Sequence, residues 1–262
     1  MARRTAPGAR TAAATGAMHG LPAGAASPDT STSGESDRMT RSAPSAAPSA
    51  APAPVEPRPR DADRSQKDIL DAALQEFAAY GLGGARMDRI AERAGVNKRL
   101  IYYYFESKES LFLAVLERAY ENIRGEEQQL NLSQVDPIEA VRRLVAFTWN
   151  YYLEHPEFLT LLNSENLHRA RHLKRSAKVR SMNSPLIQML ADVLERGHKA
   201  GLFRAGVDPV QLYISIAGLS YFYLGNCHTL STIFDRDLMG AKARLERLSH
   251  MNDLVLGYLV RD

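Results

Sequence analysis

The residues whose types and spacing best suit recognition chemistry lie in one short segment, Met87–Glu106, which reads MDRIAERAGVNKRLIYYYFE. A helix-turn-helix needs a small residue where its helices pack, a turn residue that tolerates positive φ, and apolar anchors on either side. Ala91 and Gly95 meet the first two needs. The apolar anchors are Ile90, Val96 and Ile101. This spacing predicts two short helices that meet at Gly95, with Asn97 capping the second.

The second predicted helix carries cationic and aromatic side chains near its exposed face. A recognition helix presents its N-terminal residues to base edges, while flanking residues contact phosphates. The charge is locally positive, +3 over residues 86–99. Taken singly, these residues are typical of a solvated helix face or of core packing, and we expect Tyr102 to be partly structural. Taken together they favour DNA binding. They are Lys98, Arg99, Tyr102, Tyr103 and Tyr104.

The sequence has no comparable pattern for catalysis or for a metal ion. It contains no P-loop, no dinucleotide-binding glycine motif and no nucleophile elbow. Glu165 and His168 are three residues apart, as in helical di-metal sites, but a second such pair is missing. A single cysteine, Cys227, excludes a disulfide framework and an all-cysteine zinc site. We therefore predict a protein that is not an enzyme and that has no metal site and no cofactor.

The elements that position these residues belong to a chain of 262 residues with two unlike parts. In residues 1–64, 38 positions are Ala, Pro, Ser or Gly, and only Leu21 and Val55 are strong core formers. Such a segment buries too little apolar surface to offset the entropy of folding. We predict residues 1–64 to be a disordered tail, either dispensable or absent from the natural protein, with Met18 and Met39 as alternative starts.

Beyond the tail, apolar residues recur at helical spacing, and no sustained two-residue alternation predicts a strand. Ser65 is expected to cap the first helix and Gly81 to end it. Proline after Asp or Ser predicts further helix starts. These pairs are Asp136-Pro137, Ser184-Pro185 and Asp208-Pro209. The predicted fold class is all-α, with a helix-turn-helix domain over residues 65–112 and a helical effector-binding and dimerisation domain over residues 113–262.

Residues 209–234 form an uncharged and mostly apolar run. Its scattered Gln, Ser, Gly, Asn and His residues argue against a membrane span. A helix that is apolar all round is buried all round. We expect the domain's own core to cover one side of this helix and a second subunit to cover the other. The final helix, Leu245–Leu259, would form the second half of that interface.

Residues 66–120 closely resemble the N-terminal DNA-binding domain of the TetR family of bacterial transcriptional regulators. The matching motifs are Ile69-Leu70-x-Ala72-Ala73, Phe77-x-x-Tyr80-Gly81, Ile90-Ala91-x-x-Ala94-Gly95-Val96 and Tyr102-x-x-Phe105-x-x-Lys108-x-x-Leu111. The chain departs from the family pattern at Arg86, Asn97 and Arg99-Leu100, so its operator sequence does not follow from a relative. Residues 203–213 resemble sequences of the RutR-like branch of the family.

The resemblance implies a cytoplasmic homodimer whose recognition helices enter successive major grooves of a near-palindromic, double-stranded operator. It also implies a small-molecule effector, and a repressor released by that effector is the leading interpretation. The alternatives are a transcriptional activator of the same fold and a helical small-molecule-binding protein without specific DNA binding. The DNA-binding residues that it implies, together with those expected from the motif itself, are Arg86, Asn97, Lys98, Arg99, Tyr103, Tyr104 and Lys108.

The effector pocket is expected to combine aromatic walls with a few polar groups. For any single residue, core packing or solvent exposure is the competing interpretation. The candidates are Trp149, Tyr152, Phe158, Asn163, Asn166 and His168. Residues 169–180 hold six cations and no acid. We interpret them as a solvated linker, with contact to an anionic effector or to DNA as the alternatives.

Overall fold

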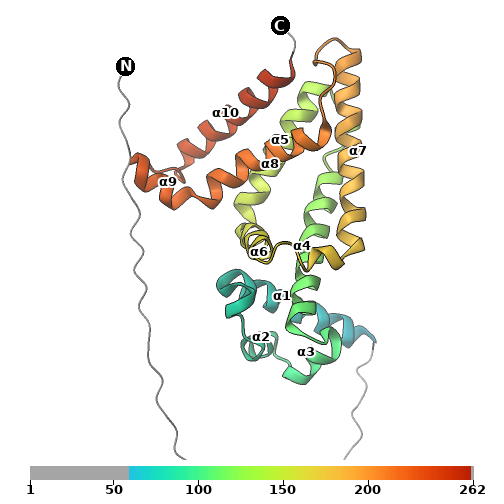
Figure 1. Cartoon of the computed structure of the whole chain (residues 1–262), viewed down its shortest axis with the longest axis vertical. Coiled ribbons are helices and arrows are strands. Elements are labelled where there is room, and N and C mark those ends of the chain that lie inside the picture. Colours follow the sequence, from blue (N-terminus) through green and yellow to red (C-terminus); the bar gives the residue numbers. More distant parts are fainter. Residues whose placement is uncertain (1–58, 261–262) are drawn as a thin grey trace, which may run out of the picture. The chain divides into compact units, whose positions relative to one another are not determined.

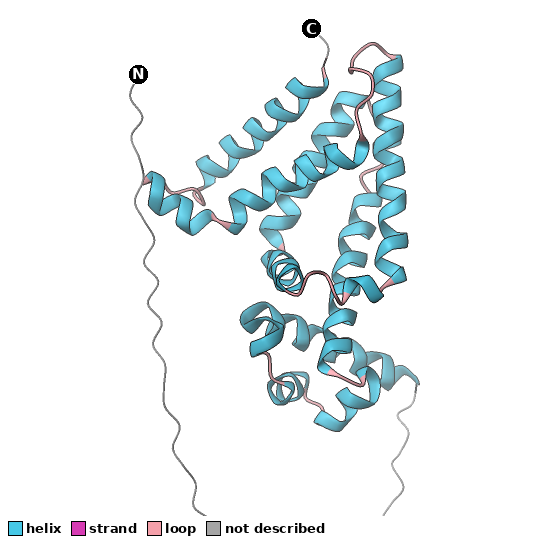
Figure 2. Cartoon of the chain, viewed as in Figure 1, coloured by secondary structure: helices cyan, strands magenta, loops and turns pink. Residues whose placement is uncertain are grey.

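The computed structural model describes residues 59–260, and this part of the chain is built from helices (Figure 1). The helices are α1 (Pro59–Gly84), α2 (Met87–Ala94), α3 (Lys98–Phe105), α4 (Lys108–Gln128), α5 (Pro137–Glu154), α6 (Pro156–Leu167), α7 (Ala177–Lys199), α8 (Pro209–Gly225), α9 (Cys227–Phe234) and α10 (Ala241–Leu259). Figure 2 shows helices joined by short loops, without a strand in the described part. The all-α prediction is confirmed. Residues 1–58 of the predicted disordered tail lie outside the described residues, whereas residues 59–64 are helical, so the prediction was wrong for these six positions.

The first helix begins earlier than its sequence pattern predicts. α1 starts at Pro59, so Ser65 lies inside the helix, and the prediction that Ser65 caps it was wrong. An ion pair one turn apart, Arg64–Asp68 at 4.0 Å, accompanies the added length. The other end agrees with the prediction, because Gly81 has φ 64° and ψ 176° and interrupts the helix.

The first three helices and the beginning of α4 share one hydrophobic core. Phe77 of α1 and Phe112 of α4 are both fully buried and meet edge to face, with ring centroids 5.1 Å apart. Ile90 of α2 and Ile101 of α3 are also fully buried, as their spacing predicts. Gly95 ends α2 with φ 65°, a left-handed conformation that glycine adopts without strain.

The helices α5, α7, α8 and α10 surround a second core. Trp149 belongs to this core with 2% exposure, and its indole meets the Tyr223 ring edge to face. Two of the predicted helix starts are present. Asp136 caps α5 and Asp208 caps α8, each with proline in the first turn that follows.

The third predicted helix start, at Pro185, was wrong. α7 begins at Ala177, where the Ser176 hydroxyl accepts a hydrogen bond from the Val179 amide at 3.1 Å. Val179 is itself buried, so packing as well as the cap favours the earlier start. Pro185 therefore lies inside α7, where it lacks one backbone donor.

The uncharged run over residues 209–234 forms two helices instead of one. α8 ends at Gly225 and α9 begins at Cys227, with Asn226 between them. Within the single chain, α8 buries Leu212 and Ile216 but leaves Ile214 and Phe222 exposed. The domain's own core thus covers one side of α8 only, as the sequence predicts.

Candidate functional site

The helix-turn-helix is held in place by local capping and by one buried acid. Asn97 caps α3 by accepting a hydrogen bond from the Arg99 amide at 2.9 Å, as predicted. Arg86 precedes α2, and its side chain makes no cap, but its amide donates to Glu76 Oε1 at 2.9 Å. Arg89 Nε donates to the same oxygen at 2.7 Å. Glu76 therefore fixes the start of α2 against α1.

Glu76 is a positioning residue that sequence reasoning missed. It is fully buried, and burial alone would raise its pKa, but hydrogen bonds from Arg89 and from the Arg86 amide lower the pKa below its usual value. The signal was an acid beside Phe77, on the apolar side of an amphipathic helix. An acid there needs a specific partner, since an unpaired buried charge is strongly unfavourable.

The predicted DNA-contacting residues at the start of α3, and Arg86 before α2, are open to solvent. Arg86 and Arg99 are exposed, and Tyr103 is 73% exposed. Lys98 lies beside them, with its Nζ atom 2.7 Å from Asp88 of α2. The hydrogen bond between Lys98 and Asp88 raises the pKa of the lysine and lowers the pKa of the aspartate. Both groups are therefore charged at neutral pH.

The three consecutive tyrosines have different surroundings. Tyr104, rather than Tyr102, packs against the core of the first three helices, so the expected structural role of Tyr102 is not observed. Tyr102 is 42% exposed. The Tyr104 hydroxyl is buried without a hydrogen-bond partner among the described residues. Tyr103 remains the most accessible of the three and meets the Tyr104 ring edge to face.

Lys108 lies at the first position of α4, directly after the turn that follows α3. The Ser107 hydroxyl caps α4 by accepting from the Ser110 amide at 3.0 Å. Lys108 Nζ donates to the Ala85 carbonyl at 3.3 Å, which ties α4 to the residue before Arg86. Lys108 thus borders the predicted interface and also supports it.

The predicted effector residues do not form one cluster. Tyr152 and Phe158 are buried together, with ring centroids 5.8 Å apart. Trp149 belongs to the separate core of α5, α7, α8 and α10. Asn163 is exposed and accepts a hydrogen bond from the Tyr221 hydroxyl. Asn166 is also exposed.

His168 lies beside a buried pair that sequence reasoning mentioned only in part. Its ring centroid is 5.7 Å from that of His172. His172 Nδ1 is 2.6 Å from Glu165 Oε2, and both residues are buried. Glu165 also accepts the His172 and Leu173 amides, at 2.8 and 2.9 Å. Glu165 therefore stabilises the turn that follows α6. Its ionisable partner is His172 and not His168.

The basic segment over residues 169–180 is partly buried. His172 and Ser176 are buried, whereas the cations Arg169, Arg171, Lys174 and Arg175 are exposed. Lys178 pairs with Glu121 of α4 at 2.6 Å. The segment therefore comprises a packed connection between α6 and α7 and the first turn of α7, with a solvated cationic side.

A buried ionic cluster joins α4 to α8, and sequence reasoning missed it. Arg124 and Glu127 of α4 pair with each other, and Arg124 also donates to the Tyr213 hydroxyl at 2.7 Å. The pair is 5% and 1% exposed. Apolar residues recur every four positions along α4, at Leu111, Val115, Ala119 and Ile123, and Glu127 takes the next position on this apolar stripe. A charged residue on an apolar stripe was the available signal.

Residues 59–260 include no helix that is long and apolar enough to cross a membrane. Over the same range, no three His, Cys, Asp or Glu side chains gather as a potential metal site.

Comparison with known families gives two matches. Residues 69–115 match the family described as bacterial regulatory proteins, tetR family. Residues 137–255 match the description tetracyclin repressor-like, C-terminal domain. The first match covers the helix-turn-helix and the start of α4, and the second runs from α5 into α10.

Curated relatives carry regulatory names. The chain is 42% identical over 204 residues to the HTH-type transcriptional repressor NicS of Pseudomonas putida, covering 78% of this chain and 96% of NicS. It is 33% identical over 141 residues to the repressor SCO4008 of Streptomyces coelicolor, covering 53% and 69%. The similarity to the regulator RutR of Escherichia coli, 49% identity, extends over 59 residues, 22% of this chain and 28% of RutR. The resemblance to the RutR-like branch is therefore partial.

Solved structures share the fold. A putative transcriptional regulator of Streptomyces coelicolor, SCO4942, has a TM-score of 0.57 at 24% identity, covering 76% of this chain and 99% of that one. A TetR family regulator of Marinobacter aquaeolei has a TM-score of 0.58 at 20% identity, covering 76% and 97%.

Proposed function

Since the chain belongs to the TetR family of bacterial transcriptional regulators, we propose that it is a cytoplasmic, operator-specific repressor that a small molecule releases from DNA. The observation that carries this proposal is the solvent-exposed face of α3. There Arg99 and Tyr103 project from a helix whose start and turn are fixed by Asn97 and Gly95. A rigid helix with exposed cationic and aromatic residues near its N-terminus suits the major groove.

Repression is favoured over activation by the relatives' names. NicS and SCO4008 are both named transcriptional repressors, and the chain spans 96% of NicS. FasR of Mycolicibacterium smegmatis, named an activator, is 30% identical over 64% of this chain. Repressor and activator use the same DNA-binding surface, so the proposed roles of the α3 residues hold in either case.

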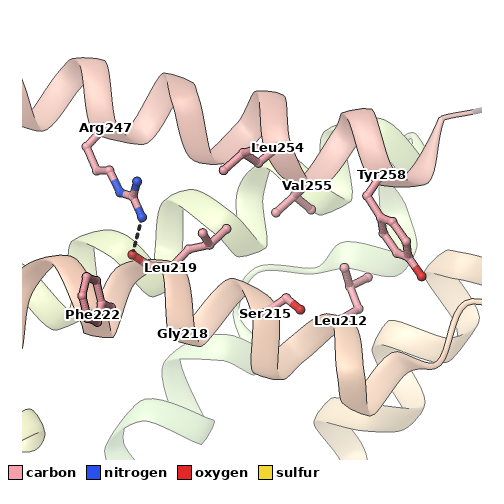
Figure 3. A pocket seen from close by; sticks show the side chains of 9 residues that line it. All are labelled: Leu212, Ser215, Gly218, Leu219, Phe222, Arg247, Leu254, Val255 and Tyr258. Carbon is pink, nitrogen blue, oxygen red and sulfur yellow. Dashed lines mark hydrogen bonds between the residues drawn. The ribbon is translucent and has the colours of Figure 1, made fainter. Parts of the chain in front are cut away.

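A homodimer accounts for the apolar surface that α8 and α10 leave uncovered. A groove of about 550 Å³ runs between these helices. Figure 3 shows Leu212 and Leu219 of α8 facing Leu254 and Val255 of α10 across it. Exposed apolar patches of this kind mark protein interfaces. A two-fold pairing of this surface would present two copies of α3 to one palindromic operator.

The proposal is tested by titrating the purified full chain into DNA from upstream of its own gene, with scrambled DNA as the control. We expect at least ~10³-fold tighter binding to the first, the usual margin for specific recognition. If the upstream DNA is not bound more tightly than scrambled DNA, random-site selection tests for an operator elsewhere. Enrichment of no sequence would reject the repressor and favour a helical small-molecule-binding protein.

A further inference from the structure

The Arg124–Glu127–Tyr213 cluster contains polar atoms that the fold does not satisfy. Among the described residues, Arg124 Nε and Glu127 Oε1 are buried without a hydrogen-bond partner. Both side chains are more than nine-tenths buried. A buried ion pair stabilises a folded protein little more than apolar residues of similar size would. Each buried polar atom without a hydrogen-bond partner lowers the stability further. Stability alone therefore does not account for this cluster.

Aromatic side chains lie beside the cluster. Tyr152 of α5 and Tyr120 of α4 both interact electrostatically with Tyr213 and with Arg124. The Phe158 ring lies edge to face with that of Tyr120 at 5.6 Å. Burial raises the pKa of Tyr120 to about 12, so its phenol is neutral and able to donate at neutral pH. A permanent cation with phenolic donors and ring edges suits an organic anion.

Glu127 is the member of the cluster whose charge changes near neutral pH. Burial raises its pKa to about 7, and the Arg124 charge only partly opposes this. The charged or titratable groups that interact with it are Arg124 of α4, Tyr151 and Tyr152 of α5, and Tyr213 of α8. Burial raises the pKa of each of these phenols, so Glu127 alone titrates near neutral pH. At a pH near 7 both its ionised and its neutral form are therefore populated.

We propose that Arg124, with Tyr213 and Tyr152, is the receptor for the carboxylate of a small, largely apolar or aromatic effector that takes the place of the Glu127 carboxylate. This inference rests on the proposed small-molecule control and names the chemistry of that molecule. The charge balances, because one anion enters and Glu127 binds one proton from solvent. The Arg124 guanidinium keeps a carboxylate partner throughout, and its planar fork can bind the new one through two N–H groups.

The test measures thermal stabilisation of the full chain, without DNA, by benzoate, phenylacetate and butyrate, each compared with its primary amide. We expect at least one acid to bind at least tenfold more tightly than its amide. The paired substitution R124Q/E127Q leaves no buried charge unpaired, and it should lower the affinity for that acid at least tenfold. The matched control R143Q/E139Q removes an exposed ion pair of α5, 3.0 Å long, and should change nothing.

A second measurement does not depend on the folding of the double variant. Calorimetry at pH 8 in buffers of different ionisation enthalpy should detect uptake of about one proton per acid bound, because Glu127 is ionised before binding. The E127Q variant should bind the acid with no proton uptake. Equal affinity for acids and amides, retained binding in R124Q/E127Q, or proton uptake by E127Q would each overturn the proposal. Failure of operator binding would leave all these readings unchanged, so the two proposals fail separately.

Discussion

At the scale of single residues, Lys98 and Tyr103 are the side chains that most directly test the proposed DNA contact. Replacing either with alanine should weaken operator binding by about tenfold or more, because a base or phosphate contact is lost in each half-site. The fold should persist, since Tyr103 is exposed and Lys98 pairs with an exposed acid, Asp88. Fluorescence anisotropy with operator DNA provides the measurement. Lys199→Ala, which removes an exposed lysine paired with Glu195, is the control.

Unchanged affinity in both Lys98→Ala and Tyr103→Ala would remove α3 from the proposed interface. Circular dichroism of both variants establishes that any loss of binding is not a loss of fold.

Glu76 should make the stability of the helix-turn-helix depend on pH. Its pKa is lowered in the folded chain, so its contribution is complete above the unfolded value of about 4.5 and is lost as the pH falls through the folded value. Glu76→Gln should reduce the free energy of unfolding by about 1–3 kcal/mol at pH 7, because a charged hydrogen-bond acceptor is lost. The difference from wild type should shrink as the solution is acidified.

Urea unfolding at several pH values measures this effect. Glu92→Gln, at an exposed position of α2, is the matched control. A pH-independent difference between Glu76→Gln and wild type would mean that the carboxylate charge is not what stabilises α2.

At the scale of secondary structure elements, local signals predict the helix boundaries well. Gly95, Asn97 and the two Asp-Pro pairs act within one turn of the chain, so their effect is visible in the sequence. Ser184-Pro185 carries the same local signature and yet lies inside α7. There the Ser176 cap and the burial of Val179 extend the helix toward its N-terminus, and tertiary packing overrides the local signal.

The end of α7 offers a test of packing. A Cβ atom built on Gly197 would lie 2.0 Å from the Phe203 ring, and Phe203 is fully buried. Gly197→Ala should therefore destabilise the C-terminal core by about 1–3 kcal/mol despite the better helix propensity of alanine. Gly125→Ala is the matched control, because that position on α4 is exposed and has no neighbouring atom within 4 Å.

Gly125→Ala should stabilise the chain by up to about 1 kcal/mol. Chemical denaturation of both variants gives the comparison. Equal stability of Gly197→Ala and wild type would show that Phe203 can leave its place beside α7.

At the scale of the whole molecule, the proposed dimer depends on the groove between α8 and α10. Phe222 lines this groove and is 59% exposed in the single chain. Phe222→Asp should convert the dimer to a folded monomer, because a charge would be buried in an apolar interface. Analytical ultracentrifugation measures the change, and operator affinity should fall with it. Leu167→Asp, at an apolar α6 position with 84% exposure, should leave the dimer intact.

A stable dimer of the Phe222→Asp variant would place the subunit interface elsewhere. In that case the groove between α8 and α10 would need another occupant.

At the candidate site, contacts between residues far apart in the sequence could not be predicted from the sequence. The helix-turn-helix was found because its defining residues lie within 20 positions of one another, from Met87 to Glu106. The bond between Arg124 and Tyr213 joins residues 89 positions apart, and that between Leu82 and Ser164 joins residues 82 apart. No local pattern indicates such pairs. The apolar stripe of α4 predicted the helix but not the partner that its buried charges would find.

The continuity of α4 has a mechanical consequence. One helix runs from Lys108, beside the predicted DNA interface, past Arg124 in the buried cluster. At a rise of 1.5 Å per residue, these positions are about 24 Å apart along a single rod. A rod turns a small rotation at one end into a large displacement at the other, so a tilt of ~10° would move its far end by roughly 4 Å. That displacement exceeds the length of a hydrogen bond. A small tilt of α4 is therefore enough to misalign a recognition helix with its groove.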